Sequence, residues 1–197
     1  MNEVEIWGVL NKKEFDSKLD EFTKKYGNPK IQERLAIQIL DVDDTSLWTR
    51  IRITDGKAEI MQKVGSWDIG EQKEISVSLS PDLETVWRTF VIIKNLLKKR
   101  RYQVVIIQHK NFTFKTDGYE IKLSHQFGKT SKYPFEVEAT KKDSELVSFA
   151  KKLGLTPDLK KKGEEFWNKW NEEVNLDGEK MKDKELKEII RKYIKGN

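Results

Sequence analysis

The chain has 197 residues, of which 37% are hydrophobic, 36% are charged and 10% are aromatic. This suits about one ordered domain, and the absence of cysteine excludes disulfides, zinc–thiolate sites and thiol nucleophiles. The net charge of +5 is small beside 38 basic and 33 acidic residues, and no apolar run approaches a membrane span, so we expect a cytoplasmic protein with no membrane contact.

The first half of the chain predicts a strand, a helix and then a series of strands. Residues 1–10 alternate in polarity, and apolar residues recur at helical spacing from position 15 to position 26, where Gly27 ends the helix. Further strands are expected at 33–42, 47–54, 57–64 and 73–79. Asp55-Gly56 is a typical two-residue hairpin turn between two of them.

The second half repeats this order, which indicates two similar halves. Ser80 is expected to cap a helix that Pro81 opens and that extends to about position 97. Strands follow at 102–114, 119–127 and 135–140, and helices at 146–153 and 166–174. Residues 175–178 are the expected linker to a last amphipathic helix. We therefore predict a domain at 1–175 and an appended C-terminal helix at 176–197.

Two basic clusters, at 98–101 and 160–162, could suggest a nucleic-acid partner. Lysine and arginine also favour the last turn of a helix, where they interact with the helix dipole. No groove-reading motif accompanies the clusters. We therefore interpret them as solvated helix ends and loops, and expect no nucleic-acid partner.

Charged residues follow one side of the predicted strands. Several occur in pairs spaced by two, so that the members of a pair share one face of a strand. The residues on this side are Glu3, Glu5, Arg50, Arg52, Glu59, Lys63, Glu74, Lys110, Lys122, Glu136 and Glu138. The opposite sides are apolar, as in Ile51 and Ile53.

An antiparallel sheet with its charged face in water would explain this pattern. The paired carboxylates, the paired cations and about eight strands favour a different α+β fold, a closed antiparallel eight-stranded β-barrel with flanking helices. Burying such charges is costly unless a ligand or metal pairs them. Carboxylates are suitable ligands for Mg²⁺ or Mn²⁺, and arginine and lysine neutralise phosphate oxygens.

Short motifs on these strands resemble the CYTH, or triphosphate tunnel, superfamily, which includes class IV adenylyl cyclases and thiamine triphosphatases. Glu3-Val4-Glu5 resembles the start of the ExExK motif of that superfamily. Arg50-Ile51-Arg52, followed by Asp55-Gly56 and Lys63, resembles its RxR hairpin and the lysine that follows it. Glu136-Val137-Glu138 resembles its EIE strand. The order of the motifs over roughly residues 1–175 carries the resemblance, because each motif alone is common.

The resemblance implies an eight-stranded tunnel, a triphosphate-bearing small molecule as substrate, and Mg²⁺ or Mn²⁺ as cofactor. It implies metal ligation by Glu3, Glu5, Glu136 and Glu138, and phosphate contacts by Arg50, Arg52 and Lys63. Lys110 and Lys122, on the charged side of later strands, are further candidates for phosphate binding.

Four places depart from the family pattern. Trp7 replaces the lysine of ExExK, and Gln108-His109-Lys110 replaces a K-x-R strand. Ser124 replaces an aspartate, and Glu74-Ile75-Ser76 lies where the family often has ExE. Trp7 is expected to point into the tunnel, where it could stack on a base or thiazole, or plug the lumen. The alternation along the strands places both histidines, His109 and His125, opposite the charged faces.

The leading functional hypothesis is a metal-dependent phosphohydrolase acting on tripolyphosphate, a nucleoside triphosphate or thiamine triphosphate. Two alternatives stay open: a class IV-type adenylyl cyclase, and a non-catalytic protein that binds polyphosphate or nucleotide. The sequence also leaves open whether the chain forms a homodimer.

Overall fold

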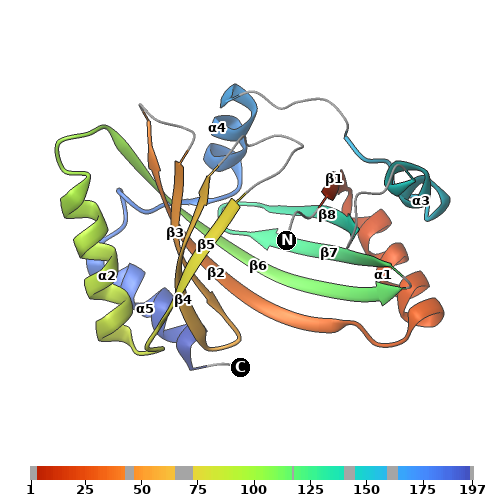
Figure 1. Ribbon diagram of the computed structural model, residues 1–197, viewed down its shortest axis with the longest axis horizontal. Helices are drawn as coiled ribbons and strands as arrows, with labels where there is room; N and C mark the ends of the chain where they lie inside the picture. The colour runs from red at the N-terminus through yellow and green to blue at the C-terminus, as the bar shows by residue number, and fades with distance from the viewer. Residues whose placement is uncertain are drawn as a thin grey trace.

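A computed structural model describes residues 4–42, 47–64, 73–116, 118–139, 145–158 and 164–195. Its centre is one antiparallel sheet with the strand order β1-β8-β7-β6-β2-β3-β4-β5, shown in Figure 1. The strands are β1 (Val4–Leu10), β2 (Lys30–Asp41), β3 (Leu47–Thr54), β4 (Lys57–Val64), β5 (Lys73–Leu79), β6 (Tyr102–Thr116), β7 (Tyr119–Phe127) and β8 (Ser131–Ala139). A ninth, short strand, β9 (Leu176–Asp177), pairs with β6.

The predicted set of antiparallel strands is confirmed, but the closed barrel is not. Within the residues that the structure describes, β1 pairs only with β8 and β5 only with β4, so these two strands are the edges of the sheet. Alternation in a sequence indicates which side chains share a face, but it carries no information on whether two distant edges meet.

The two halves expected from the sequence are present. The order strand, helix and three strands occurs first in β1–α1–β2–β3–β4 and again in β5–α2–β6–β7–β8. The halves join where β2 and β6 pair along their length, from Lys30 opposite Thr113 to Asp41 opposite Tyr102. Each half therefore contributes one long strand to the middle of the sheet.

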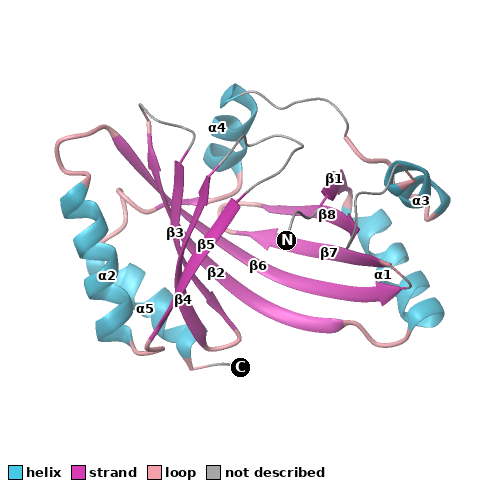
Figure 2. Cartoon of the chain, viewed as in Figure 1, coloured by secondary structure: helices cyan, strands magenta, loops and turns pink. Residues whose placement is uncertain are grey.

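Two pairs of helices pack on the sheet, at opposite ends of its strand order, as Figure 2 shows. They are α1 (Lys12–Tyr26) and α3 (Leu146–Lys152) beside β1, β7 and β8, and α2 (Leu83–Leu96) and α5 (Asp183–Ile194) beside β2 and β3. A fifth helix, α4 (Glu164–Glu173), lies apart from both pairs. Phe15 and Phe22 of α1 are buried in one core with Phe135 and Val137 of β8. Ile37, Ile51 and Ile106 belong to a second core, beneath α2 and α5.

Local sequence signals account for the helix ends and for one hairpin. Asn11 and Glu14 form a capping box at α1, with the Asn11 Oδ1 atom accepting from the Glu14 backbone N–H at 2.9 Å. At α2 the cap is Asp82, which accepts from the Thr85 backbone N–H at 2.8 Å, and not Ser80 as predicted. Asp55 and Gly56 have φ angles of 48° and 77°, the left-handed conformation that the predicted two-residue hairpin requires.

The C-terminal segment is tied to the sheet at two places. Leu176 and Asp177 of β9 lie opposite Ile106 and Val105, so the predicted linker at 175–178 contains a short strand. Beyond it, α5 buries Leu186 and Ile190 in the second core. A domain division at residue 175 stays a prediction. None of the described helices has the length and apolar character needed to cross a membrane.

Candidate functional site

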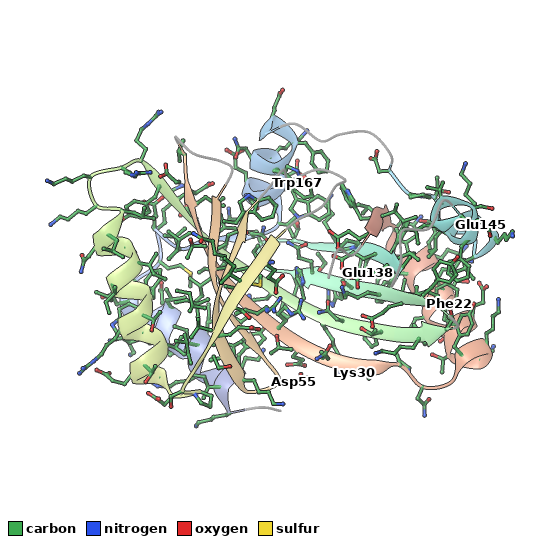
Figure 3. The ribbon with its side chains drawn as sticks, viewed as in Figure 1. Phe22, Lys30, Asp55, Glu138, Glu145 and Trp167 are labelled. Atoms are coloured by element: carbon green, nitrogen blue, oxygen red, sulfur yellow. The ribbon has the colours of Figure 1, made fainter. Side chains whose placement is uncertain are left out.

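The face of the sheet opposite the two cores carries most of the charged pairs, and we call it the inner face. Ile51 and Ile53 point into the second core, so Arg50 and Arg52 lie on the inner face of β3. Phe135 and Val137 point into the first core, so Glu136 and Glu138 lie on the inner face of β8. In Figure 3 the labelled Glu138 projects from β8.

Three carboxylates meet on the inner face. Glu5 lies directly opposite Glu138 across the β1–β8 pair, and Glu136 lies two positions along the same strand. One ligand atom from each of Glu5, Glu136 and Glu138 lies within 4.8 Å of the others, so the three could hold a metal ion. We call these residues the carboxylate group. Glu3, the fourth predicted ligand, lies outside the described residues.

Lys122 lies beside the carboxylate group. Its ammonium donates to Glu136 and, at 2.9 Å, to Glu138. Burial alone would lower the pKa of Lys122, but the two glutamates together raise it above its ordinary value. Lys122 therefore compensates two of the three carboxylates, and a divalent cation would compete with it there.

The arginines of the first half form the cationic part of the inner face. Arg52 is already neutralised, because it pairs with Glu59 at 2.7 Å and with Glu74 at 3.3 Å. Arg50 differs: its buried Nε atom has no hydrogen-bond partner in the described part of the chain. Burial, and then the nearby Arg52, lower the pKa of Arg50 to about 10.

A third arginine, Arg34 on β2, was not singled out from the sequence. Its Nε donates to the Thr54 hydroxyl at 3.2 Å, and burial lowers its pKa. The carboxylate of Glu136, from the second half, opposes that shift. The arginines of one half are therefore within electrostatic reach of the carboxylates of the other. The alternation of Leu35, Ile37 and Ile39 with polar or small residues could have revealed Arg34.

The inner face of β6 carries residues other than those expected. His109 and Asn111 lie there, opposite Gln126 and Ser124 of β7. The prediction that His109 lies opposite the charged faces is therefore wrong, because the alternation along this strand was assigned one residue out of phase.

Lys110 accordingly lies on the outer side, with its Nζ 5.9 Å from the ring centroid of Phe112. Gln108 is also on that side and accepts a hydrogen bond from the Tyr193 hydroxyl at 3.2 Å. The structure does not bring Lys110 together with the other candidate phosphate ligands. For Lys63 only the backbone is described, opposite Trp48 and Glu74.

Trp7 lies on the inner face of β1, where the aromatic residues of α4 contact it. Its ring centroid is 6.0 Å from that of Phe166 and 5.3 Å from that of Trp167, which Figure 3 labels on α4. The hydroxyl of Thr130 and the ammonium of Lys129 bind backbone carbonyls at the C-terminal end of α4. Trp7 therefore packs against α4, and its expected role in a tunnel stays a prediction.

Comparisons with known proteins place the fold. No protein-family model matches the sequence, and no curated protein matches it. Among solved structures, the PH1012 protein of Pyrococcus horikoshii superposes with a TM-score of 0.60 at 17% identity, over 81% of this chain and 96% of that one. Two others are named as proposed adenylate cyclases. The one from Bacillus halodurans has a TM-score of 0.58 at 13% identity, over 83% of this chain and 97% of that one.

The second, from Vibrio parahaemolyticus, has a TM-score of 0.54 at 14% identity, over 85% of this chain and 98% of that one. At such identities the similarity establishes a shared fold and leaves the chemistry to the residues. The α+β architecture of this chain is thus one that proteins named as proposed adenylate cyclases also adopt.

The dependence of the free energy of unfolding on pH, below about pH 5, tests the ion pair between Lys122 and Glu136. Lys122 holds the pKa of Glu136 at about 2, against the effect of burial, whereas the ordinary glutamate value is about 4.3. Because the folded pKa is the lower one, this stabilisation is present above about pH 4.3 and is lost as the pH falls towards 2. We expect the free energy of unfolding to fall over that window, and to fall less in Glu136→Gln.

Urea titrations from about pH 5 down to pH 2 would measure this difference. The Glu136 side chain keeps 39% of its surface exposed, so solvent screening limits the size of the effect. Glu84→Gln, which removes an exposed carboxylate on α2, is the matched control. The same pH dependence in Glu136→Gln and the unsubstituted protein would contradict the assignment.

Proposed function

We propose that this chain is a metal-dependent phosphohydrolase that binds a triphosphate-bearing small molecule on its inner face. One observation carries the proposal: the arginines of the first half share one face of the sheet with the carboxylate group, and the buried Nε of Arg50 on that face has no hydrogen-bond partner among the described residues. A buried donor left without an acceptor costs about 1–3 kcal/mol. An anionic oxygen would satisfy it.

Divalent metal fits the donor set of the carboxylate group. Three carboxylates with ligand atoms within 4.8 Å of one another offer the hard oxygens that Mg²⁺ and Mn²⁺ prefer. When bound, such an ion supplies positive charge near the phosphoryl groups and lowers the pKa of a bound water. Arg34 and Arg50 would orient the phosphate chain and offset its charge, since Arg52 and Lys122 already have glutamate partners.

Two observations each support a different function, a cyclase or a non-catalytic binding protein. The fold similarity to proteins named as proposed adenylate cyclases supports a cyclase as the second candidate, with a ribose hydroxyl as the nucleophile in place of water. The bridge from Lys122 to Glu136 and Glu138 supports a non-catalytic binder, because these glutamates are neutralised without a metal.

The decisive experiment measures metal binding and product formation in the same set of variants. Mn²⁺ should raise the melting temperature, and at a hundredfold excess over its Kd it should stabilise the protein by about 2.7 kcal/mol. Glu5→Gln combined with Glu138→Gln should abolish this shift, whereas Glu84→Gln should retain it. In parallel, phosphate release and cyclic nucleotide should be assayed with tripolyphosphate, nucleoside triphosphates and thiamine triphosphate.

Phosphate release that the double substitution removes would support the hydrolase. Cyclic nucleotide in its place would favour the cyclase. Tight triphosphate binding with no metal-induced shift and no product would rule out hydrolysis and leave a binding protein.

A further inference from the structure

Two neutral side-chain nitrogens lie side by side on the inner face of β6, and neither has a partner in the part of the chain that the structure describes: an amide donor of Asn111, and a ring nitrogen of His109 that donates when the ring carries its proton at Nε2. The Nδ2 atom of Asn111 and the Nε2 atom of His109 are buried and form no hydrogen bond in the described part of the chain. The two residues are spaced by two on one strand, on the side opposite Phe112 and Phe114. More than about 90% of buried polar groups in proteins have a partner, so such a pair indicates a missing acceptor.

The amide of Asn111 is oriented so that its NH₂ group remains available to donate a hydrogen bond. Only 1% of the residue is exposed, and its Oδ1 atom accepts from the Ser124 hydroxyl at 2.8 Å. The carbonyl oxygen of the side chain is thereby used within the protein. What remains is an uncharged donor that needs an oxygen from outside the described chain.

His109 lies next to the cations of the first half. It is directly opposite Arg34 across the β2–β6 pair. Burial, and then the charge of Arg34, lower its pKa to about 4, so its ring is neutral near pH 7. The opposite charge of Glu136 also reaches the ring. His109 therefore lies between the arginines and the carboxylate group and presents no charge of its own.

The donors of the inner face are thus unequal in charge. Arg34 and Arg50 offer cationic donors from the first half, whereas Asn111, together with His109 in the tautomer protonated at Nε2, offers neutral donors from the second. The ends of a triphosphate can be unequal in the same way. A terminal phosphoryl group has a second acidic proton, with a pKa of about 6 in phosphomonoesters. A phosphoryl group esterified to an organic alcohol lacks that proton and carries less negative charge.

We propose that Asn111 and His109 form a neutral subsite for the ester-linked phosphoryl group of an organic triphosphate. The inference rests on the proposed function, because the arginines must hold the more highly charged terminal groups. It makes these two residues determinants of specificity, which favour an organic triphosphate over inorganic tripolyphosphate. Inorganic tripolyphosphate would place a dianionic end against donors that cannot neutralise it.

Methyl triphosphate is the sharpest probe, because it differs from inorganic tripolyphosphate only by the ester and has no base or sugar. With Mg²⁺ present at about pH 7.5, calorimetric titration of the unsubstituted protein should show tighter binding of methyl triphosphate, by roughly tenfold, the value of about one neutral hydrogen bond. Equal affinities, or tighter binding of tripolyphosphate, would overturn the proposal. This test uses only the unsubstituted protein, so it does not depend on whether a variant folds.

Variants then assign the preference to the two residues. Asn111→Ala and His109→Ala should each weaken methyl triphosphate binding by about five- to tenfold and leave tripolyphosphate binding within about twofold. Lys110→Ala, on the outer side of the same strand, is the matched control and should change neither affinity.

If the variants retain the preference, the two nitrogens bind water only and the proposal is wrong. If no triphosphate binds the unsubstituted protein, the proposed function fails together with the inference. Arginine-dependent binding without a preference for the ester would overturn the inference alone.

Discussion

Replacing Arg50 with alanine is expected to weaken tripolyphosphate binding by about 1.5–3 kcal/mol, the value of one charge-assisted hydrogen bond. Among the described residues the buried Nε atom of Arg50 has no hydrogen-bond partner, so this donor is available to a ligand. Arg52 is a poorer choice for this test, because its pairs with Glu59 and Glu74 make its removal a change in the folded protein as well.

Arg50→Ala also removes a buried, unsatisfied donor, and for that reason its free energy of unfolding should not fall with its affinity. Calorimetric titration would give the affinity, and urea unfolding would give the stability. Arg88→Ala, which removes an exposed arginine paired with Glu84 on α2, is the control. Unchanged affinity of Arg50→Ala for tripolyphosphate would count decisively against the site.

Replacing Ile190 with alanine is expected to lower the free energy of unfolding by about 2–5 kcal/mol, the range for truncating a buried aliphatic side chain. Ile190 is fully buried on α5, where it belongs to the second core together with residues of α2 and of the sheet. Chemical denaturation would measure the loss. Glu188→Ala, an exposed position on the same helix, should cost little.

Because α5 lies on the side of the sheet opposite the inner face, the part of Ile190→Ala that is folded should bind triphosphate with unchanged affinity. A normally stable Ile190→Ala protein that had lost triphosphate binding would place α5 in the site and refute this division of roles.

The sequence was most informative where a strand alternates strictly. In β8, Phe135 and Val137 alternate with Glu136 and Glu138, and the structure buries the first pair and turns the second to the inner face. The same rule places Arg50 and Arg52 correctly. Period-two alternation is a local property of a strand, so it survives without any knowledge of the strand's partners.

The alternation rule failed where both faces of a strand are apolar. Val104, Val105 and Ile106 of β6 are all buried, so the first part of that strand does not show which residues point to the inner face and which point to the outer side. Only Phe112 and Phe114 fix the phase, and they share the parity of Lys110, which identifies Lys110 as outward and His109 as inward. A reading anchored on these two aromatic residues would have found the neutral donors.

Long-range arrangements were beyond a reading of local patterns. The sequence could not show that Lys122 would bridge Glu136 and Glu138, that α4 would lie on Trp7, or that β1 and β5 would remain edges. Each depends on how segments far apart in the chain pack together. Local patterns indicate which residues can take part in such packing, and not which of them meet.

The place of β1 at the edge of the sheet ties site assembly to the order of folding. Its partner β8 lies more than a hundred positions away, with Val4 opposite Ala139, so among the described strand pairs this one closes the longest loop. Contacts of this kind are slow to form, and an edge strand with one neighbour is among the first elements to open. Glu5 reaches Glu136 and Glu138 only while β1 is paired. Any cation held by these three carboxylates would therefore join the amino-terminal strand to β8 and stabilise their pairing.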